Sequence, residues 1–317
     1  NKNIDVIVYH SHWRLINVWV GSLLARIMGK RVLFYTMGWY RKQSLLSRFI
    51  RRLFFSIPHG LCLYGRWAKY QGVLSGYDIK KLHVVYNSLD YASQRKYRLS
   101  ISSEKIKETR KNIFNDTETP VVIRTGRLIK RAKIDQLFFA TKKLMDDGYK
   151  LNILLVGDGP EKNHLQKLSR ELNINVFFYG PCYDEKKLAD LITCSNVTVS
   201  PGMTGLTSIH SCAYGTPVVT HNDPWNQMPE WEIVHEKISG SLHKRNDIES
   251  ICESIKKYIK NSIPSQQDRE KCSSLLEKIY NSKTRRRAFD WAVSGNNADD
   301  LFYLKDGEGK LDHNDIS

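Results

Sequence analysis

The sequence lacks the features that mark several specialised classes of protein. None of its six cysteines belongs to a C-x-x-C pair, so neither a zinc site nor a disulfide framework is expected, and a reducing, cytoplasmic location fits. No apolar run approaches the ~18–20 residues of a membrane-spanning helix, and no signal peptide heads the chain. Asp-x-Asp is also missing. We therefore expect no metal and no other cofactor.

Acidic residues are scarce relative to basic ones. The chain has 49 Lys and Arg against 33 Asp and Glu, and its net charge of +16 predicts attraction to phosphates or to an anionic membrane surface. Nucleic acid is not an expected partner, because the sequence shows neither a recognised binding module nor stacking aromatics on a basic face. The chain begins at Asn1 and enters a strand pattern almost at once, so we expect its N-terminal start to be missing.

Short apolar runs alternate with helical patterns in two successive stretches. Strand-like runs fall at residues 5–9, 31–35, 60–64 and 82–86, and then at 121–124, 151–156, 176–179, 197–199 and 217–219. This alternation predicts an α/β fold with two Rossmann-like domains that face each other across a cleft. The predicted domains are residues 1–118, a truncated N-terminal domain with a polar linker, and 119–285, a C-terminal domain. Residues 286–317 form a tail without a predicted fold.

A glycine-bearing loop between a strand and a helix is the most informative motif. The strand ends at Ser200, and a helix begins near Thr207. Gly202 and Gly205 allow close approach of a ligand to the backbone, and the free N–H groups of the helix suit a diphosphate. Thr207 and Ser208 can cap the helix or donate to a phosphate oxygen. The alternative is an ordinary capped turn between a strand and a helix.

The order and spacing of several motifs resemble the retaining family-4 glycosyltransferases of the GT-B fold, of the type that builds bacterial cell-surface polysaccharides. The matching segments are residues 84–90, Gly126-Arg127-Leu128, residues 156–160, Tyr179-Gly180, Pro201, Gly205-Leu206, residues 215–219, Pro229-Glu230 and Gly240. The resemblance covers about residues 5–259. It implies that residues 119–285 bind a nucleotide sugar.

The resemblance assigns the diphosphate to two cations. The family places an arginine after the strand, which is Arg127 here, and a lysine five residues later, which is Ala132 here. Lys133 is the first choice to replace that lysine, so Arg127 and Lys133 are the predicted catalytic residues, which neutralise charge on the leaving group. The alternative is that both are solvated charges at the start of a helix.

Two glutamates of the family are replaced in the glycine loop and its helix. The first falls on Gly202 and the second on His210. The second usually holds the ribose, which His210 could do through a ring nitrogen. The alternative for His210 is a structural role. With Gly205, Leu206, Thr207 and Ser208, these residues make up the predicted substrate-binding site.

Further candidates lie in the N-terminal half. The family often has His-Gly after the second strand, and Met37-Gly38 stands there, so Met37 and Gly38 complete the predicted substrate-binding residues. His10 and His12 follow the first strand and could also face the cleft.

The resemblance implies transfer of a sugar from a UDP- or GDP-sugar to a hydroxyl of a glycan or lipid-linked acceptor. The anomeric configuration would be retained, and the expected setting is the synthesis of bacterial surface polysaccharide such as lipopolysaccharide. Two alternatives remain. One is a catalytically impaired homologue that binds nucleotide or a partner enzyme, and the other is a sugar-nucleotide epimerase of the same fold.

Residues 41–54 have the pattern of a basic amphipathic helix. The basic residues Arg41, Lys42, Arg48, Arg51 and Arg52 surround the apolar residues Leu45, Leu46, Phe49, Ile50, Leu53 and Phe54. Such a helix suits anionic headgroups, and lipid-acceptor transferases act at the inner membrane surface. We therefore expect peripheral contact with the cytoplasmic face of the membrane. The alternative is a helix that packs its apolar face on the sheet.

Overall fold

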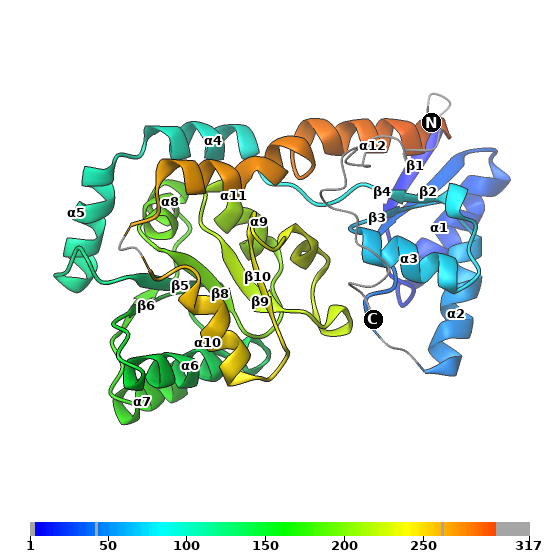
Figure 1. Ribbon diagram of the computed structural model, residues 1–317. Helices are drawn as coiled ribbons and strands as arrows, with labels where there is room; N and C mark the ends of the chain where they lie inside the picture. The colour runs from blue at the N-terminus through cyan, green and yellow to red at the C-terminus, as the bar shows by residue number, and fades with distance from the viewer. Residues whose placement is uncertain (1–3, 42–43, 261–262, 296–317) are drawn as a thin grey trace. The chain divides into compact units, whose positions relative to one another are not determined.

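The computed structural model describes residues 4–41, 44–260 and 263–295 in two compact units (Figure 1). Over these residues, unit 1 comprises 4–41, 44–87 and 282–295. Unit 2 runs from Ser88 to Asn281. Each unit is a parallel sheet covered by helices, which confirms the predicted α/β fold with two Rossmann-like halves.

Unit 1 is built on a four-stranded parallel sheet in the order β1-β2-β3-β4. The strands are β1 (Val6–His10), β2 (Arg31–Thr36), β3 (Gly60–Leu63) and β4 (Leu82–Val84). The helices are α1 (Ile16–Ile27), α2 (Leu45–Ser56), α3 (Arg66–Leu74), the short η1 (Ile79–Lys81) and α12 (Ser282–Ser294). Because parallel neighbours need a crossover, each strand is followed by a helix before the next begins.

Helix α12 brings the end of the described chain back to the first sheet. Ala288 and Ala292 are fully buried against Leu33 and Cys62. Arg285 Nη2 also donates to the hydroxyl of Tyr35 at 2.8 Å. Residues 286–295 of the predicted tail thus have a defined place in unit 1, whereas residues 296–317 lie outside the described part of the chain.

Unit 2 contains a six-stranded parallel sheet in the order β10-β9-β8-β5-β6-β7. The strands are β5 (Val121–Thr125), β6 (Asn152–Val156), β7 (Val176–Gly180), β8 (Val197–Ser200), β9 (Val218–His221) and β10 (Gly240–His243). The chain builds β5, β6 and β7 in one direction and then returns to place β8 beside β5. This is the order of a doubly wound nucleotide-binding sheet, with its switch point between β5 and β8.

Helices cover both faces of this sheet. They are α4 (Tyr91–Ser100), α5 (Ser103–Phe114), α6 (Ile134–Asp146), α7 (Lys162–Glu171), α8 (Glu185–Thr193), α9 (Leu206–Ala213), α10 (Ile248–Lys256) and α11 (Gln266–Lys278), with short helices η2 (Lys130–Ala132), η3 (Pro224–Asn226) and η4 (Pro229–Ile233). Alternate strand residues serve the two faces. Val122 and Ile153 pack with α6 and α10, whereas Ile123 and Leu154 pack with α5 and α8.

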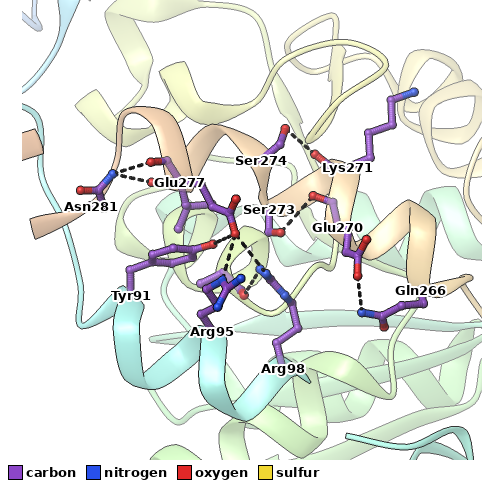
Figure 2. Close-up of polar contacts among 12 residues, drawn as sticks. Tyr91, Arg95, Arg98, Gln266, Glu270, Lys271, Ser273, Ser274, Glu277 and Asn281 are labelled. Carbon is purple, nitrogen blue, oxygen red and sulfur yellow. Dashed lines mark hydrogen bonds and ion pairs between the residues drawn. The ribbon is translucent and has the colours of Figure 1, made fainter. Parts of the chain in front are cut away.

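The units divide at different points from the predicted domain boundaries. The sequence predicts boundaries after residues 118 and 285, whereas the compact units divide after Asn87 and Asn281. The first boundary differs because the polar stretch before residue 119, which is predicted to be a linker, forms α4 and α5. Both helices belong to unit 2. Tyr91 and Arg95 of α4 both donate to Oε1 of Glu277 in α11, at 3.0 and 3.1 Å (Figure 2).

Candidate functional site

The predicted residues of unit 2 lie at the switch point of its sheet. Arg127 follows the carboxyl end of β5, and the glycine loop follows the carboxyl end of β8, which pairs with β5. In open α/β sheets, ligands bind outside these strand ends at the place where the strand order reverses. The fold therefore brings Arg127 and the glycine loop to one edge of the sheet.

The two loops at this edge touch through Gly202. Its N–H donates to the carbonyl of Ala132 at 3.1 Å. A Cβ added at Gly202 would lie only 2.1 Å from the carbonyl oxygen of Arg131, so a larger residue does not fit this geometry. Ala132 is itself buried in the core of unit 2. Gly202 and Ala132, two departures from the glycosyltransferase pattern, are therefore in contact and form one packing arrangement.

The first turn of α9 presents free donors. Gly205 is the N-cap, and the structure gives the N–H groups of Leu206 and Thr207 no acceptor among the described residues. Ser208 differs, because its hydroxyl lies 2.7 Å from the carbonyl of Gly205 and 2.9 Å from that of Glu230. Its hydroxyl is directed to these carbonyls. The backbone of α9 is thus the stronger candidate for an anion than the Ser208 side chain.

The two predicted cations have different surroundings. The exposed side chain of Arg127 makes no hydrogen bond or ion pair with another described residue. Lys133 is half-buried in a left-handed conformation, with φ of 50°, and its ammonium group contacts Oδ1 of Asn246. Burial, followed by the charge of Arg245, lowers the pKa of Lys133. Lys133 also lines a cavity of about 310 Å³ beside α6 and α7. Of the two predicted cations, Arg127 is therefore the one whose side chain is unpaired among the described residues.

A third cation at this edge is missing from the sequence-based prediction. Arg124 is part of the β5 run that predicts an ordinary buried strand, yet its side chain reaches the end of that strand. It is 6% exposed, and its Nε and Nη1 atoms have no partner in the described structure. Burial lowers the pKa of Arg124 to about 10, so the group remains charged at neutral pH. An arginine in an otherwise apolar strand is the signal that could have identified it.

His210 is paired with a carboxylate that the sequence does not single out. Its Nε2 lies 2.7 Å from Oε1 of Glu185, the first residue of α8. The hydroxyl of Tyr214 donates to the same oxygen at 2.6 Å. Burial alone would raise the pKa of Glu185, but the hydrogen bonds from Tyr214 and His210 outweigh it and lower this pKa. Glu185 is therefore an ionised partner that orients His210.

The candidates of unit 1 share a hollow of their own. Met37, Gly38, His10 and His12 line a cavity of about 150 Å³ at the carboxyl ends of β1 and β2. Buried Arg51 lines it as well. Burial, followed by nearby cationic groups that include Arg51, lowers the pKa of His12. Gly38 has φ of 67°, a conformation that glycine adopts most easily.

Helices α1 and α2 expose much of their apolar surface. We use the name apolar outer face for Ile16, Val20, Leu24 and Ile27 of α1 with Leu45, Leu46, Phe49 and Leu53 of α2, all of which are exposed. The two helices are neighbours, since the rings of Trp19 and Phe54 lie 4.9 Å apart. Of the predicted amphipathic helix, Phe54 packs on the sheet as the alternative predicts and Ile50 is half-buried, whereas Leu45, Leu46, Phe49 and Leu53 are exposed. Lys42 lies outside the described residues.

Comparison with known proteins identifies a family, whose match lies within unit 2, and several curated relatives. Residues 105–277, more than half of the chain, match the family described as glycosyl transferases group 1. An alpha-monoglucosyldiacylglycerol synthase of Streptococcus pneumoniae is 25% identical over 179 residues, 54% of this chain and 38% of that protein. The lipopolysaccharide core biosynthesis glycosyltransferase LpsE of Rhizobium meliloti is 25% identical over 152 residues, 47% of this chain and 42% of that protein. The chain thus spans less than half the length of these curated relatives.

Solved structures share the fold of both units. Anabaena Alr3699/HepE in complex with UDP matches with a TM-score of 0.74 and 15% identity, over 92% of this chain and 78% of that one. At this level of identity the likeness establishes the fold alone. It confirms the GT-B architecture that the motif order predicts.

Proposed function

The chain belongs to the glycosyl transferases group 1 family, and we propose that it moves a sugar from a UDP- or GDP-sugar to a hydroxyl of a glycan or lipid-linked acceptor. The observation that carries the proposal is the edge of unit 2 where Arg127 follows β5 and the first turn of α9, with its free N–H groups, follows β8. The two segments meet there, since Oγ1 of Thr207 donates to the carbonyl of Thr125 at 3.5 Å. A helix N-terminus with an unpaired arginine suits the diphosphate of such a donor. The complex of Alr3699/HepE with UDP supports a nucleotide ligand for this fold.

In the proposed reaction the protein stabilises the leaving group. The bond between the anomeric carbon and the phosphate oxygen breaks, and the acceptor oxygen bonds to the same face of the sugar, so the configuration is retained. The acceptor's proton passes to the departing phosphate oxygen. Arg127 and the α9 amides stabilise the charge that develops on the diphosphate. Because these groups supply positive charge, the proposal includes no resident metal and no other cofactor.

His210 is the proposed contact for the nucleotide ribose. The carboxylate of Glu185 holds its Nε2, which leaves Nδ1 to face a ligand. A ring held in this way can exchange a hydrogen bond with a ribose hydroxyl through Nδ1. This arrangement replaces the glutamate that the glycosyltransferase pattern has at this position.

A second candidate is a homologue that binds nucleotide but transfers no sugar. The packing of Ala132 against Gly202 favours it, because this arrangement removes a lysine and a glutamate of the pattern together. Lys133 does not simply restore the lysine, since Asn246 engages its ammonium group. The two candidates agree on nucleotide binding and differ only in turnover.

We further propose that unit 1 docks on the anionic cytoplasmic face of a membrane. The apolar outer face would enter the headgroup region, while the exposed Arg48 and Arg52 of α2 would contact lipid phosphates. None of the described helices is long and apolar enough to cross a membrane. One relative is named a monoglucosyldiacylglycerol synthase and another a lipopolysaccharide core glycosyltransferase, which supports a lipid-linked acceptor in surface polysaccharide or glycolipid synthesis.

Calorimetric titration followed by a transfer assay tests the proposal. We expect UDP or GDP to bind the full chain, and the matching nucleotide sugar to label a component of a bacterial lipid extract. NMR of the product would show the retained configuration. Binding without transfer to any extract would identify the second candidate. Failure of both nucleotides to bind would refute the proposed function.

A further inference from the structure

Arg124 differs from the other buried arginines of unit 2. Arg98, Arg110 and Arg269 are 3%, 0% and 4% exposed, and each donates to a backbone carbonyl. The bonds join Arg98 to Ala213 at 3.0 Å, Arg110 to Cys194 at 2.7 Å and Arg269 to Thr193 at 2.7 Å. Arg124 is buried to the same degree but makes no hydrogen bond or ion pair with a described residue. Structural arginines of this unit thus have acceptors, and Arg124 has none.

An unpartnered cation in the interior is unfavourable unless something outside the chain compensates it. Removal of a charge from water carries a large desolvation penalty in a folded protein. Buried polar groups in native proteins therefore almost always have partners, and an orphan points to a ligand. An anionic ligand would compensate the charge of Arg124.

The guanidinium of Arg124 lies at the mouth of the switch point. A Cβ added at Gly126 would be 3.2 Å from Nη1 of Arg124 and 3.8 Å from Oγ1 of Thr207. Arg124 therefore lies close to the first turn of α9, whose Leu206 and Thr207 N–H groups are free. Arg127 follows immediately after Gly126. Three sources of positive charge thus surround the end of β5.

We propose that Arg124 binds the diphosphate of the nucleotide-sugar donor as a second cation beside Arg127. The inference rests on the proposed function and adds a residue to its site. Arg124 would supply, from the strand itself, the charge that Ala132 cannot supply from the following loop. Its planar guanidinium can donate to two phosphate oxygens at once, which a lysine cannot do in the same geometry.

Calorimetric titration of the full chain and of Arg124→Met tests this assignment. Methionine is unbranched and neutral, so it fills much of the space without charge. We expect the Kd for UDP or GDP, whichever the wild type prefers, to increase by about 10- to 100-fold, since hydrogen bonds to charged groups are lost. The matching nucleoside, uridine or guanosine, lacks phosphate and should bind both proteins equally. Arg124→Lys keeps the charge and should give an intermediate Kd.

Thermal unfolding of the ligand-free proteins separates this role from a structural one. If Arg124 serves a ligand, Arg124→Met should melt at the wild-type temperature or above, because an uncompensated charge has been removed. The matched control Arg269→Met should melt lower, because the carbonyl of Thr193 loses its donor. A less stable Arg124→Met protein, or one that binds nucleotide as tightly as the wild type, would overturn the assignment. If the wild type binds no nucleotide, it is the proposed function that fails.

Discussion

The two units carry similar parallel sheets but differ in what they present at their strand ends and outer surfaces. In unit 2 the strand ends gather arginines and free backbone N–H groups, and exposed large apolar residues are scattered singly. In unit 1 the strand ends form a hollow with two histidines and several aromatics, and α1 and α2 expose the apolar outer face. This difference is what the two proposals rest on: an anionic ligand for unit 2 and an apolar, anionic surface for unit 1.

Substitution of Gly202, which joins the two loops at the strand ends of unit 2, should give the largest predicted effect. We expect Gly202→Ala to destabilise the protein by about 3 kcal/mol, because the added methyl would overlap the carbonyl of Arg131 and force the loops apart. Chemical denaturation measures the loss. Gly205→Ala is the matched control. Its Cβ would lie no closer than 3.7 Å to its nearest neighbour, a side-chain carbon of Met228, so this variant should change stability little. Equal effects of the two variants would contradict the role of Gly202.

Arg127 tests whether the strand ends of unit 2 serve an anion. Arg127→Ala should weaken nucleotide binding by about tenfold or more, because an exposed, unpaired guanidinium is removed from the phosphate site. The melting temperature should change little, since the exposed side chain of Arg127 makes no hydrogen bond or ion pair with another described residue. Arg131→Ala, which removes another exposed arginine four residues later, should leave the Kd unaltered. A similar loss in both variants would point to general charge attraction instead of a defined site.

Substitutions in the apolar outer face test the proposed membrane docking of unit 1. The double change Leu46→Ser and Phe49→Ser should reduce binding to vesicles that contain anionic phospholipid by about tenfold, because two apolar side chains no longer enter the bilayer surface. Nucleotide affinity should be unchanged. Phe139→Ser in α6, an exposed apolar residue of unit 2, is the control. Vesicle sedimentation that does not distinguish the double variant from the control would exclude this face as the docking surface.

The alternation of apolar runs predicted nine of the ten strands that the described residues form, because buried parallel strands need continuous apolar segments. Strand β10 (Gly240–His243) was not predicted, since Leu242 is its one large apolar residue. The same reasoning could not reveal that α4 and α5 belong to unit 2. Their sequences are polar, and they are held by side chains such as Arg110, which is fully buried through bonds to main-chain carbonyls. From the sequence alone, a polar segment is taken for a linker, because the buried groups that its side chains bind are unknown.

Prediction from the sequence was also incomplete at the candidate site. Arg127 and the glycine loop follow strand ends in the sequence, so their convergence could be predicted from topology. Glu185 could not, because its partner His210 is distant in sequence and no local pattern links the two. Arg124 was missed for a different reason: the apolar residues around it in the strand predict that the segment is buried and indicate nothing about a ligand. Its significance is visible only once the structure shows that no acceptor accompanies it.

The pair of Glu185 and His210 gives the smallest predicted effect. The pKa of Glu185 is lowered in the folded protein, so its carboxylate stabilises the fold above its unfolded pKa of about 4.3. That stabilisation is lost as the pH falls through the lower, folded value. Glu185→Gln should therefore lower the melting temperature by about 1–3 °C at pH 7, a modest shift because the carboxylate is half exposed to solvent. The difference from wild type should shrink towards pH 3; a difference that stays constant with pH would mean that packing, not charge, holds His210 in place.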